Sequence, residues 1–177
     1  VAHSTREGNR LYVQGKYEEA ASKYGDGLVD APGSPLLQFN LGTALYKQGK
    51  YEEAIAPLSK VAASTDPAWT ARASYNLGNA LCRLASSAEE TDPQGAIGHY
   101  EQALAAYKRA MGAATQDPDP KYNHELVSRK LEELKKRLEE EKKKQEEEQQ
   151  EREKQEQQDQ AQQDQQEQQE QQEQQQQ

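Results

Sequence analysis

The sequence predicts an all-α fold in which stacked pairs of antiparallel helices form a solenoid and a long helix follows. Three observations predict it. The motif GKYEEA occurs at 15–20 and again at 49–54, 34 residues later. Within each copy, small and large apolar residues recur at helical spacing. The composition then changes to Gln and Glu, so nothing apolar remains to pack on a core after Leu138 except one alanine.

The repeat occurs three times. Gly8 and Gly42 lie 34 residues apart, and Gly78 belongs to a third copy that begins in YNLGNALCRL. The segment AIGHYEQAL (96–104) matches the second half of the earlier copies. On that match the Gly-to-Ala separation is 12 residues in copies one and two and 18 in copy three (78 to 96). Six extra residues are therefore expected in the turn between the helices of the third copy. The expected repeats are 1–33, 34–67 and 68–115, together residues 1–115, with Pro32, Pro35 and Pro67 at their boundaries.

These copies resemble the tetratricopeptide repeat (TPR). The resemblance is carried by Leu41-Gly42-x-x-Leu45 with Ala54-x-x-x-Leu58, and by Leu77-Gly78-x-x-Leu81 with Ala96-x-x-x-Tyr100. It implies a right-handed superhelical solenoid of three helix pairs, in which the first helix of each pair lines a concave groove. One pair cannot bury its apolar faces alone, so stacking of the pairs creates the core.

A capping helix that projects into solvent is expected at 116–144, starting near Lys121. Its leucines Leu126, Leu131, Leu134 and Leu138 form a stripe that can cover the last repeat. In residues 145–177, 19 of 33 residues are Gln, and 11 acids against 2 bases give a net charge of −9. We expect this tail to be largely disordered from about Gln157, as a solvated spacer. A weak coiled coil is the alternative, which the lack of apolar heptad positions disfavours.

The charge distribution and the rare residues exclude several classes of function. The whole net charge of −9 lies in the tail, so residues 1–144 balance 20 basic against 20 acidic residues, unlike a nucleic-acid-binding domain. Cys82 is the single cysteine and has no internal disulfide partner. His3, His99 and His124 have no metal-ligand spacing. We therefore expect a non-enzymatic protein without a cofactor, and no apolar run is long enough to span a membrane.

A polar stripe runs along the first helix of each copy, one residue away from the core stripe. An Asn amide can pair with the backbone of an extended peptide, and an Arg guanidinium can bind a carboxylate. The predicted groove contains Arg6, Asn9, Tyr12, Phe39, Asn40, Thr43, Tyr46, Lys47, Arg72, Tyr75, Asn76, Asn79 and Arg83. A second interpretation is that these Asn residues bond to neighbouring helices and hold the stack. The sequence leaves both open.

Part of this set resembles the carboxylate clamp of chaperone-binding TPR domains. Asn9, Asn40 and Arg72 match positions of that motif, with Arg in place of its usual Lys at 72. Thr5 and Asn76 stand where the clamp has basic residues. With three of five positions matching, the resemblance does not imply the tandem acidic ligand of those domains.

The chain also resembles the TPR proteins encoded in bacterial aerotolerance (Bat) gene clusters. This resemblance is carried by GNRLYVQGKYEEA, FNLGTALYKQGKYEEA, YNLGNAL and DPDPKYNHELVSRKLEEL. It implies an envelope-associated scaffold that works with von Willebrand A-domain proteins and a MoxR-type ATPase. Because the chain starts at Val1 rather than Met, an export signal could have been removed, so we expect the cell envelope or periplasm, with the cytoplasm left open.

Two functional hypotheses follow from these observations. In the first, the protein is an interaction module that holds a peptide or a partner helix in its groove. In the second, it is a structural protein that self-associates end to end through its terminal faces.

Overall fold

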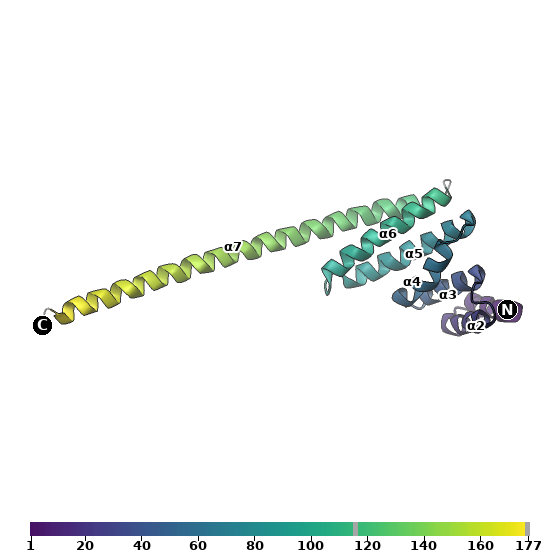
Figure 1. Cartoon of the computed structure of the whole chain (residues 1–177), viewed down its shortest axis with the longest axis horizontal. Helices are drawn as coiled ribbons and strands as arrows, with labels where there is room; N and C mark the ends of the chain where they lie inside the picture. Colours follow the sequence, from purple (N-terminus) through teal and green to yellow (C-terminus); the bar gives the residue numbers. More distant parts are fainter. Residues whose placement is uncertain (115–116, 176–177) are drawn as a thin grey trace. The chain divides into compact units, whose positions relative to one another are not determined.

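The computed structural model describes residues 1–114 and 117–175, with side chains described as far as Gln162. Within these ranges all regular secondary structure is helical (Figure 1). The helices are α1 Ala2–Val13, α2 Tyr17–Asp30, α3 Pro35–Lys47, α4 Tyr51–Ala62, α5 Pro67–Ala88, α6 Pro93–Ala113 and α7 Asp119–Gln175. The chain divides into two compact units, Val1–Leu134 and Lys135–Gln177. The first unit contains the repeats and the start of α7.

The first unit is a solenoid of stacked helix pairs. From α1 to α6, each helix packs mainly against the helices that precede and follow it in the chain, as expected when a structure is built from repeats that contact their neighbours. The predicted three helix pairs with a long C-terminal helix are confirmed.

Local sequence signals set the helix boundaries. Ser34, Asp66 and Asp92 each accept a hydrogen bond from a backbone N–H in the first turn of α3, α5 and α6, and a proline follows each of them. Gly15 and Gly49 follow the first helices of pairs one and two with φ of 77° and 78°, a conformation that other residues adopt at a cost. Helices α1 to α4 are therefore short and closely spaced, as the repeat requires.

In each pair, a glycine of the first helix lies against a large side chain of the second. A Cβ at Gly8 would lie 2.5 Å from a ring carbon of Tyr24, and one at Gly42 would lie 2.6 Å from Cγ of Leu58. A Cβ at Gly78 would lie 2.6 Å from a ring carbon of Tyr107. The glycines therefore allow the close approach of the two helices that the repeat pattern predicts.

This contact corrects the register of the third repeat. The sequence match pairs Gly78 with Ala96 and Tyr100, but the structure places Tyr107 against this glycine. Because Tyr107 follows Ala103 by four residues, as Tyr24 follows Ala20, the equivalent of Ala20 is Ala103. The Gly-to-Ala separation is then 25 residues (78 to 103), 13 more than the 12 of the other copies.

The additional residues lengthen helices rather than the turn. Helices α5 and α6 have 22 and 21 residues, whereas α1 to α4 have 12 to 14. The expectation of an insertion in the turn is therefore wrong. Helical residues added where the two helices meet pack against each other, and Ala85, Ala96 and Tyr100 are buried there. The Tyr100 hydroxyl donates a hydrogen bond to the carboxylate of Glu89 beside the turn.

Helix α7 covers the last repeat with a stripe that differs by one residue from the predicted one. The helix starts at Asp119 rather than Lys121. Val127, Leu131 and Leu134 are buried, whereas Leu126 is 44% exposed. The prediction that Leu126 faces the repeats is therefore wrong. Burial decreases after Leu134, since Leu138 is only partly buried.

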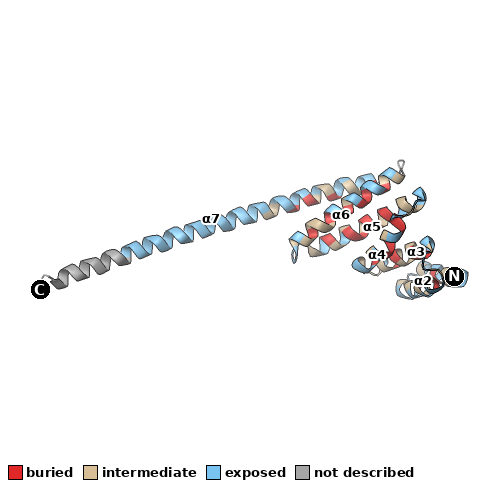
Figure 2. Ribbon diagram, viewed as in Figure 1, coloured by how far each residue is buried: buried red, intermediate tan, exposed pale blue. Residues whose placement is uncertain are grey.

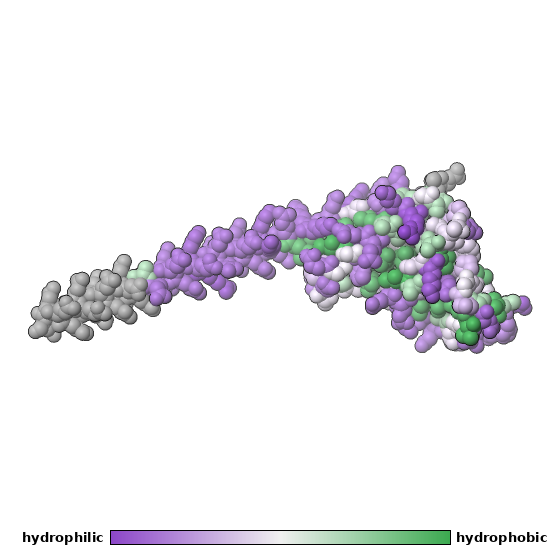
Figure 3. Space-filling view, viewed as in Figure 1, coloured by the Kyte–Doolittle hydropathy of each residue, from purple (hydrophilic) through white to green (hydrophobic). Residues whose placement is uncertain are grey.

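The second unit is helical in the structure but has no described core. Every described side chain from Glu139 to Gln162 is exposed, and this stretch of α7 is hydrophilic (Figures 2 and 3). Surface ion pairs such as Lys143 to Glu139, at 2.7 Å, link successive turns. The helix continues to Gln175, past Gln157, where the composition predicts loss of order. The side chains of 163–177 lie outside the described residues, and disorder of the tail stays a prediction.

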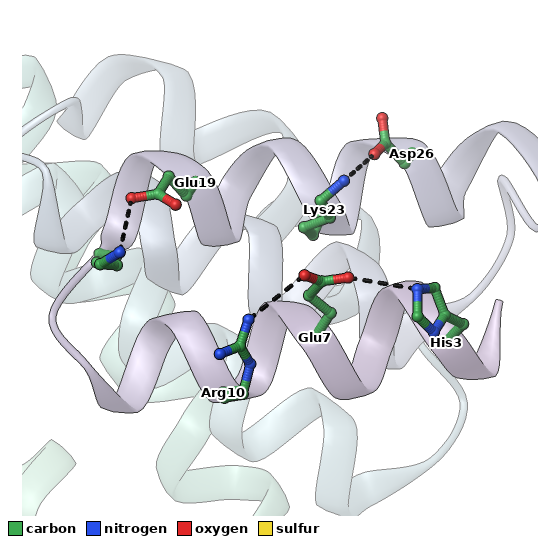
Figure 4. Close-up of polar contacts among 7 residues, drawn as sticks. His3, Glu7, Arg10, Glu19, Lys23 and Asp26 are labelled. Atoms are coloured by element: carbon green, nitrogen blue, oxygen red, sulfur yellow. Dashed lines mark hydrogen bonds and ion pairs between the residues drawn. The ribbon is translucent and has the colours of Figure 1, made fainter.

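The N-terminal face of the solenoid is polar. Leu37 of α3 is fully buried and faces the preceding pair, where a Cβ at Gly27 would lie 3.0 Å from it. The equivalent residue of α1 is His3, which is 91% exposed. The Glu7 carboxylate lies 3.3 Å from the His3 ring and 3.4 Å from the Arg10 guanidinium (Figure 4). Helix α1 thus presents ionisable groups where inner helices present apolar ones, as terminal repeats of a solenoid do.

Candidate functional site

The first helices of the repeats carry a second pattern beside their core. Asn40, Asn76 and Asn123 occupy one repeat position in α3, α5 and α7, which we call the donor position. Three residues later, one helical turn along the same face, lies the acceptor position. The acceptor position is occupied by Asn9, Thr43, Asn79 and Leu126 in α1, α3, α5 and α7.

Each donor position is hydrogen bonded to the acceptor position of the preceding first helix. Asn40 Nδ2 donates to Asn9 Oδ1 at 3.1 Å. Asn76 Nδ2 donates to Thr43 Oγ1 at 3.3 Å, and Asn123 Nδ2 donates to Asn79 Oδ1 at 3.0 Å. These three bonds form an amide ladder that joins α1, α3, α5 and α7. The ladder contributes to the stack, as the second interpretation of the Asn residues predicts.

In the first and third repeats, a buried tyrosine also donates to the ladder. Tyr24 and Tyr107 of the second helices each donate through their hydroxyl at 2.8 Å, to Asn9 Oδ1 and Asn79 Oδ1 respectively. Burial raises the pKa of Tyr24 to about 12 and raises that of Tyr107 as well. Both phenols therefore stay protonated at neutral pH and act as donors.

The ladder uses the amide nitrogens of Asn40 and Asn76 and leaves their amide oxygens. Asn40 and Asn76 donate through Nδ2, and among the described residues no group donates to their Oδ1 atoms. Both side chains are partly exposed. Each can therefore accept a hydrogen bond from a ligand while still bonding to the neighbouring helix.

Two pockets open on the face formed by the first helices. The N-terminal pocket has a volume of about 350 Å³ and is lined by Asn9, Tyr12, Val13, Tyr24, Phe39, Asn40 and Thr43. The central pocket also has a volume of about 350 Å³ and is lined by Phe39, Ala68, Ala71, Arg72, Tyr75, Asn76, Ala110, Ala114, Asp117 and Pro120. Phe39 belongs to both pockets and makes an edge-to-face contact with Trp69 at 5.7 Å between ring centroids.

The structure brings eight of the thirteen predicted groove residues into these pockets. The remaining five are Arg6, Tyr46, Lys47, Asn79 and Arg83. Asn79 belongs to the ladder instead, and Arg83 contacts Tyr51, the first residue of α4. Arg6 and Lys47 are exposed on α1 and α3.

Sequence reasoning missed several pocket residues. Ala110 and Pro120 come from α6 and α7, far along the chain from the groove motifs, and no local pattern marks them. Tyr51, which lines neither pocket but contacts Arg83, did have a signal, because it occupies the same position of the repeated GKYEEA motif as Tyr17. Tyr17 and Tyr51 contact Tyr12 and Tyr46 at 5.1 Å and 5.4 Å between ring centroids.

The groove cations have no acidic partners among the described residues. Arg6, Lys47 and Arg72 are exposed and form no ion pair there. Asp117 lines the central pocket with Arg72 without reaching ion-pair distance. The face therefore offers positive charge, amide oxygens and two apolar pockets, a combination suited to an extended segment with carboxylate and apolar side chains.

The described part of the chain has no group of three or more His, Cys, Asp or Glu residues placed to hold a metal ion. Burial raises the pKa of Cys82, so this half-buried thiol is not activated. No helix in the described ranges has the length and apolar character needed to cross a membrane.

Comparison with known proteins agrees with this fold. Residues 5–68 match the family model described as tetratricopeptide repeat. No curated protein sequence matches the chain significantly. The first TPR of Spaghetti (RPAP3), solved bound to the HSP90 peptide SRMEEVD, is 22% identical with a TM-score of 0.62, over 73% of this chain and 91% of that one.

Two further solved structures show the same likeness. A TPR protein of Thermus thermophilus is 24% identical with a TM-score of 0.63, over 75% of this chain and 66% of that one. The Sgt2 TPR domain of Aspergillus fumigatus is 24% identical with a TM-score of 0.56, over 76% and 81%. At these identities the likeness shows the fold alone. The solenoid is thus of the class of helical repeats that generally mediate protein–protein interactions, and its fold is that of the TPR.

Proposed function

We propose that the solenoid is a non-enzymatic scaffold that binds an extended segment of a partner protein on the face formed by its first helices. The observation that carries this proposal is the pair of pockets sharing Phe39, with the exposed Arg72, which has no ion-pair partner among the described residues, at one of them. Apolar side chains of the segment occupy the pockets, the Oδ1 atoms of Asn40 and Asn76 accept its backbone N–H groups, and Arg72 binds a carboxylate.

The ligand of a structurally similar domain supports this class of partner. The RPAP3 domain was solved with the peptide SRMEEVD, which has acidic and apolar side chains. In the present chain Thr5 and Asn76 replace two basic residues of the carboxylate clamp. We therefore propose an acidic, partly apolar segment without assigning that peptide's sequence.

The test is selection of a displayed random-peptide library on the full chain, followed by titration of the selected peptides on two variants. We expect the peptides to carry acidic and apolar residues and to compete with one another. Arg72→Glu reverses an exposed charge and should weaken their binding without changing thermal unfolding. Phe39→Arg should block both pockets. If Arg72→Glu and Phe39→Arg bind the selected peptides as tightly as the parent chain, the proposal is wrong.

We further propose that the partners belong to the Bat type of envelope complex, with von Willebrand A-domain proteins and a MoxR-type ATPase. The sequence motifs that resemble Bat-cluster TPR proteins support this assignment. Its test is direct binding of a purified von Willebrand A-domain protein to the parent chain and to Arg72→Glu. If the parent chain and Arg72→Glu bind this protein equally tightly, it does not bind at the proposed face.

End-to-end self-association is less favoured by the terminal faces. A second copy stacked on α1 would bury the polar cluster of His3, Glu7 and Arg10. At the other end, α7 has Glu125 at the repeat position of Gly8, where a second helix would approach closely. We therefore expect sedimentation to show a monomer over a wide concentration range. Concentration-dependent growth would favour self-assembly.

A further inference from the structure

A row of cations follows the amide ladder one helical turn further along α3, α5 and α7, whereas α1 has Val13 at this position. Lys47, Arg83 and Lys130 occupy the same repeat position in α3, α5 and α7, four residues after the acceptor position. Residues four apart lie on one face of a helix, so the three cations border the ladder on the same side. We call these three residues the cationic edge.

Arg83 is the fixed member of this edge. Its Nε donates to the Tyr51 hydroxyl at 3.3 Å, and its guanidinium carbon lies 5.7 Å from the centroid of the same ring. Tyr51 in turn contacts Tyr46. This support restricts the guanidinium and leaves its two Nη groups for another acceptor. No carboxylate of the described residues lies within ion-pair distance of Arg83.

Lys130 lies close enough to Arg83 for both charges to act on Cys82, and Lys47 occupies the equivalent position of α3. Burial raises the pKa of Cys82, whereas the positive charges of Lys130 and Arg83 both lower it. Both cations therefore lie near that thiol. Lys47 is the last residue of α3 and directly follows Tyr46. The negative charge of Glu89 raises the pKa of Cys82, and the Glu89 carboxylate accepts a hydrogen bond from Tyr100. Positive charge therefore predominates among these neighbours.

We infer that the cationic edge binds an acidic run of the partner segment, with Arg83 as its main anchor and Tyr51 as the residue that positions Arg83. The inference rests on the proposed function and adds a binding site for the ligand's carboxylates. Three cations on the alternate helices α3, α5 and α7 fit a segment with several spaced carboxylates better than one compact anion, which needs converging donors. The positions differ from those that resemble the carboxylate clamp, since none of the three is among Thr5, Asn9, Asn40, Arg72 and Asn76.

The probe is a short fluorescein-labelled peptide of alternating Glu and Ala, titrated with the full chain, beside a matched peptide with Gln in place of Glu. We expect the Glu peptide to bind more tightly and to weaken as salt is added. Arg83→Gln should lower its affinity about tenfold, the loss of one strong charge-assisted contact. Lys60→Gln is the matched control, because it removes the same charge from an exposed position of α4 and should leave affinity unchanged.

Positioning by Tyr51 is tested separately. Tyr51→Phe keeps the ring and removes the hydroxyl, so it should lower affinity about threefold, a smaller loss than removal of the charge. Arg83→Lys should behave like Tyr51→Phe, because it keeps the charge and loses the Nε–H donor. In the Arg83→Gln background, Tyr51→Phe should have no further effect. An additive loss would show that Tyr51 does not act through Arg83.

The inference is overturned if Arg83→Gln and Lys60→Gln have the same effect, or if the Gln peptide binds as tightly as the Glu peptide. This outcome is distinguishable from failure of the proposed function. In that case the peptides selected from the library would still bind Arg72→Glu more weakly than the parent chain, but would bind Arg83→Gln as tightly as the parent chain.

Discussion

The outer repeats and the middle repeat build the same helix crossing from different residues. In the first and third repeats a glycine faces a tyrosine, Gly8 against Tyr24 and Gly78 against Tyr107, and each tyrosine donates to an Asn at the acceptor position. In the middle repeat Gly42 faces Leu58, and the acceptor position holds Thr43. The tyrosine and the asparagine are therefore present together or absent together.

This difference shows that the two residues act as one unit. A buried phenol requires an acceptor, which Asn9 or Asn79 supplies on the neighbouring helix. Leu58 has no polar group, so the acceptor position next to it can hold Thr43, whose hydroxyl donates to its own helix at the Phe39 carbonyl, 2.8 Å away. The amide ladder continues in both cases, because Thr43 Oγ1 still accepts from Asn76.

The largest effect is expected where a methyl group would separate the tyrosine from the glycine. In Gly78→Ala the new Cβ would lie 2.6 Å from the rigid ring of Tyr107, so the helices must move apart. We expect a loss of about 2–3 kcal/mol in the free energy of unfolding, measured by urea titration. Gly42→Ala should cost less, because Leu58 can change rotamer.

Gly98→Ala is the matched control for this comparison. Gly98 also lies within a helix of the third repeat, but a Cβ there meets no atom within 4 Å. Alanine should therefore stabilise the chain by about 0.5–1 kcal/mol through helix propensity. Equal losses for the Gly78 and Gly98 substitutions would contradict the close-packing role of Gly78.

A transfer of the tyrosine–asparagine unit into the middle repeat should have the next largest effect. Leu58→Tyr alone places a hydroxyl beside Thr43 and should destabilise the chain by about 1–2 kcal/mol. Adding Thr43→Asn supplies the acceptor and should recover about 1 kcal/mol. The measurement is a double-mutant cycle of urea unfolding. Additive losses would show that the residues of the unit are independent.

The third repeat also shows where sequence reasoning fails. Ala96-x-x-x-Tyr100 and Ala103-x-x-x-Tyr107 are identical patterns seven residues apart. Seven residues are two helical turns, so both tyrosines lie on the same face of α6 and helical periodicity cannot separate them. Only the partner of Gly78, on another helix, decides between them. The number and order of helix pairs could be predicted because they depend on local spacing.

The candidate site, too, has features that could be predicted from the sequence and features that could not. The row of Asn residues could be predicted, because their spacing repeats along the chain. Their bonding partners could not, since Asn40 and Asn9 meet only when two repeats stack. The sequence predicts Leu126 in the core instead of Val127, because α7 has apolar residues at both of these adjacent positions and only the packing of the helix distinguishes them.

A smaller effect should follow from raising the pH. Burial raises the pKa of Tyr24 from the ordinary 10.0 to about 12. The folded state thus holds the neutral phenol after the unfolded chain has ionised it. Its contribution to stability is complete below about pH 10 and decreases as the pH rises toward 12. We expect a lower urea midpoint at the upper end of this range than at its lower end.

Tyr24→Phe provides the control for the pH experiment. This variant lacks the ionisable group and the bond to Asn9, so it should be less stable at neutral pH but lose less on going to alkaline pH. The same decrease in both chains would show that Tyr24 does not cause it. The comparison isolates one of the two tyrosine–asparagine units without disturbing the middle repeat.

The smallest effect is expected from removal of residues 145–177. The ladder and the buried stripe of α7 end before Lys135, and every described side chain from Glu139 to Gln162 is exposed. Deletion should therefore leave the melting temperature of the solenoid within about 1 °C of the parent value, because none of the described side chains of this segment makes a packed contact. Circular dichroism of a peptide of residues 145–177 should show little helix, since its Gln-rich sequence lacks apolar contacts to stabilise it. A fully helical peptide would mean that surface pairs alone can hold this segment, whereas a large fall in melting temperature would mean that the tail packs on the repeats.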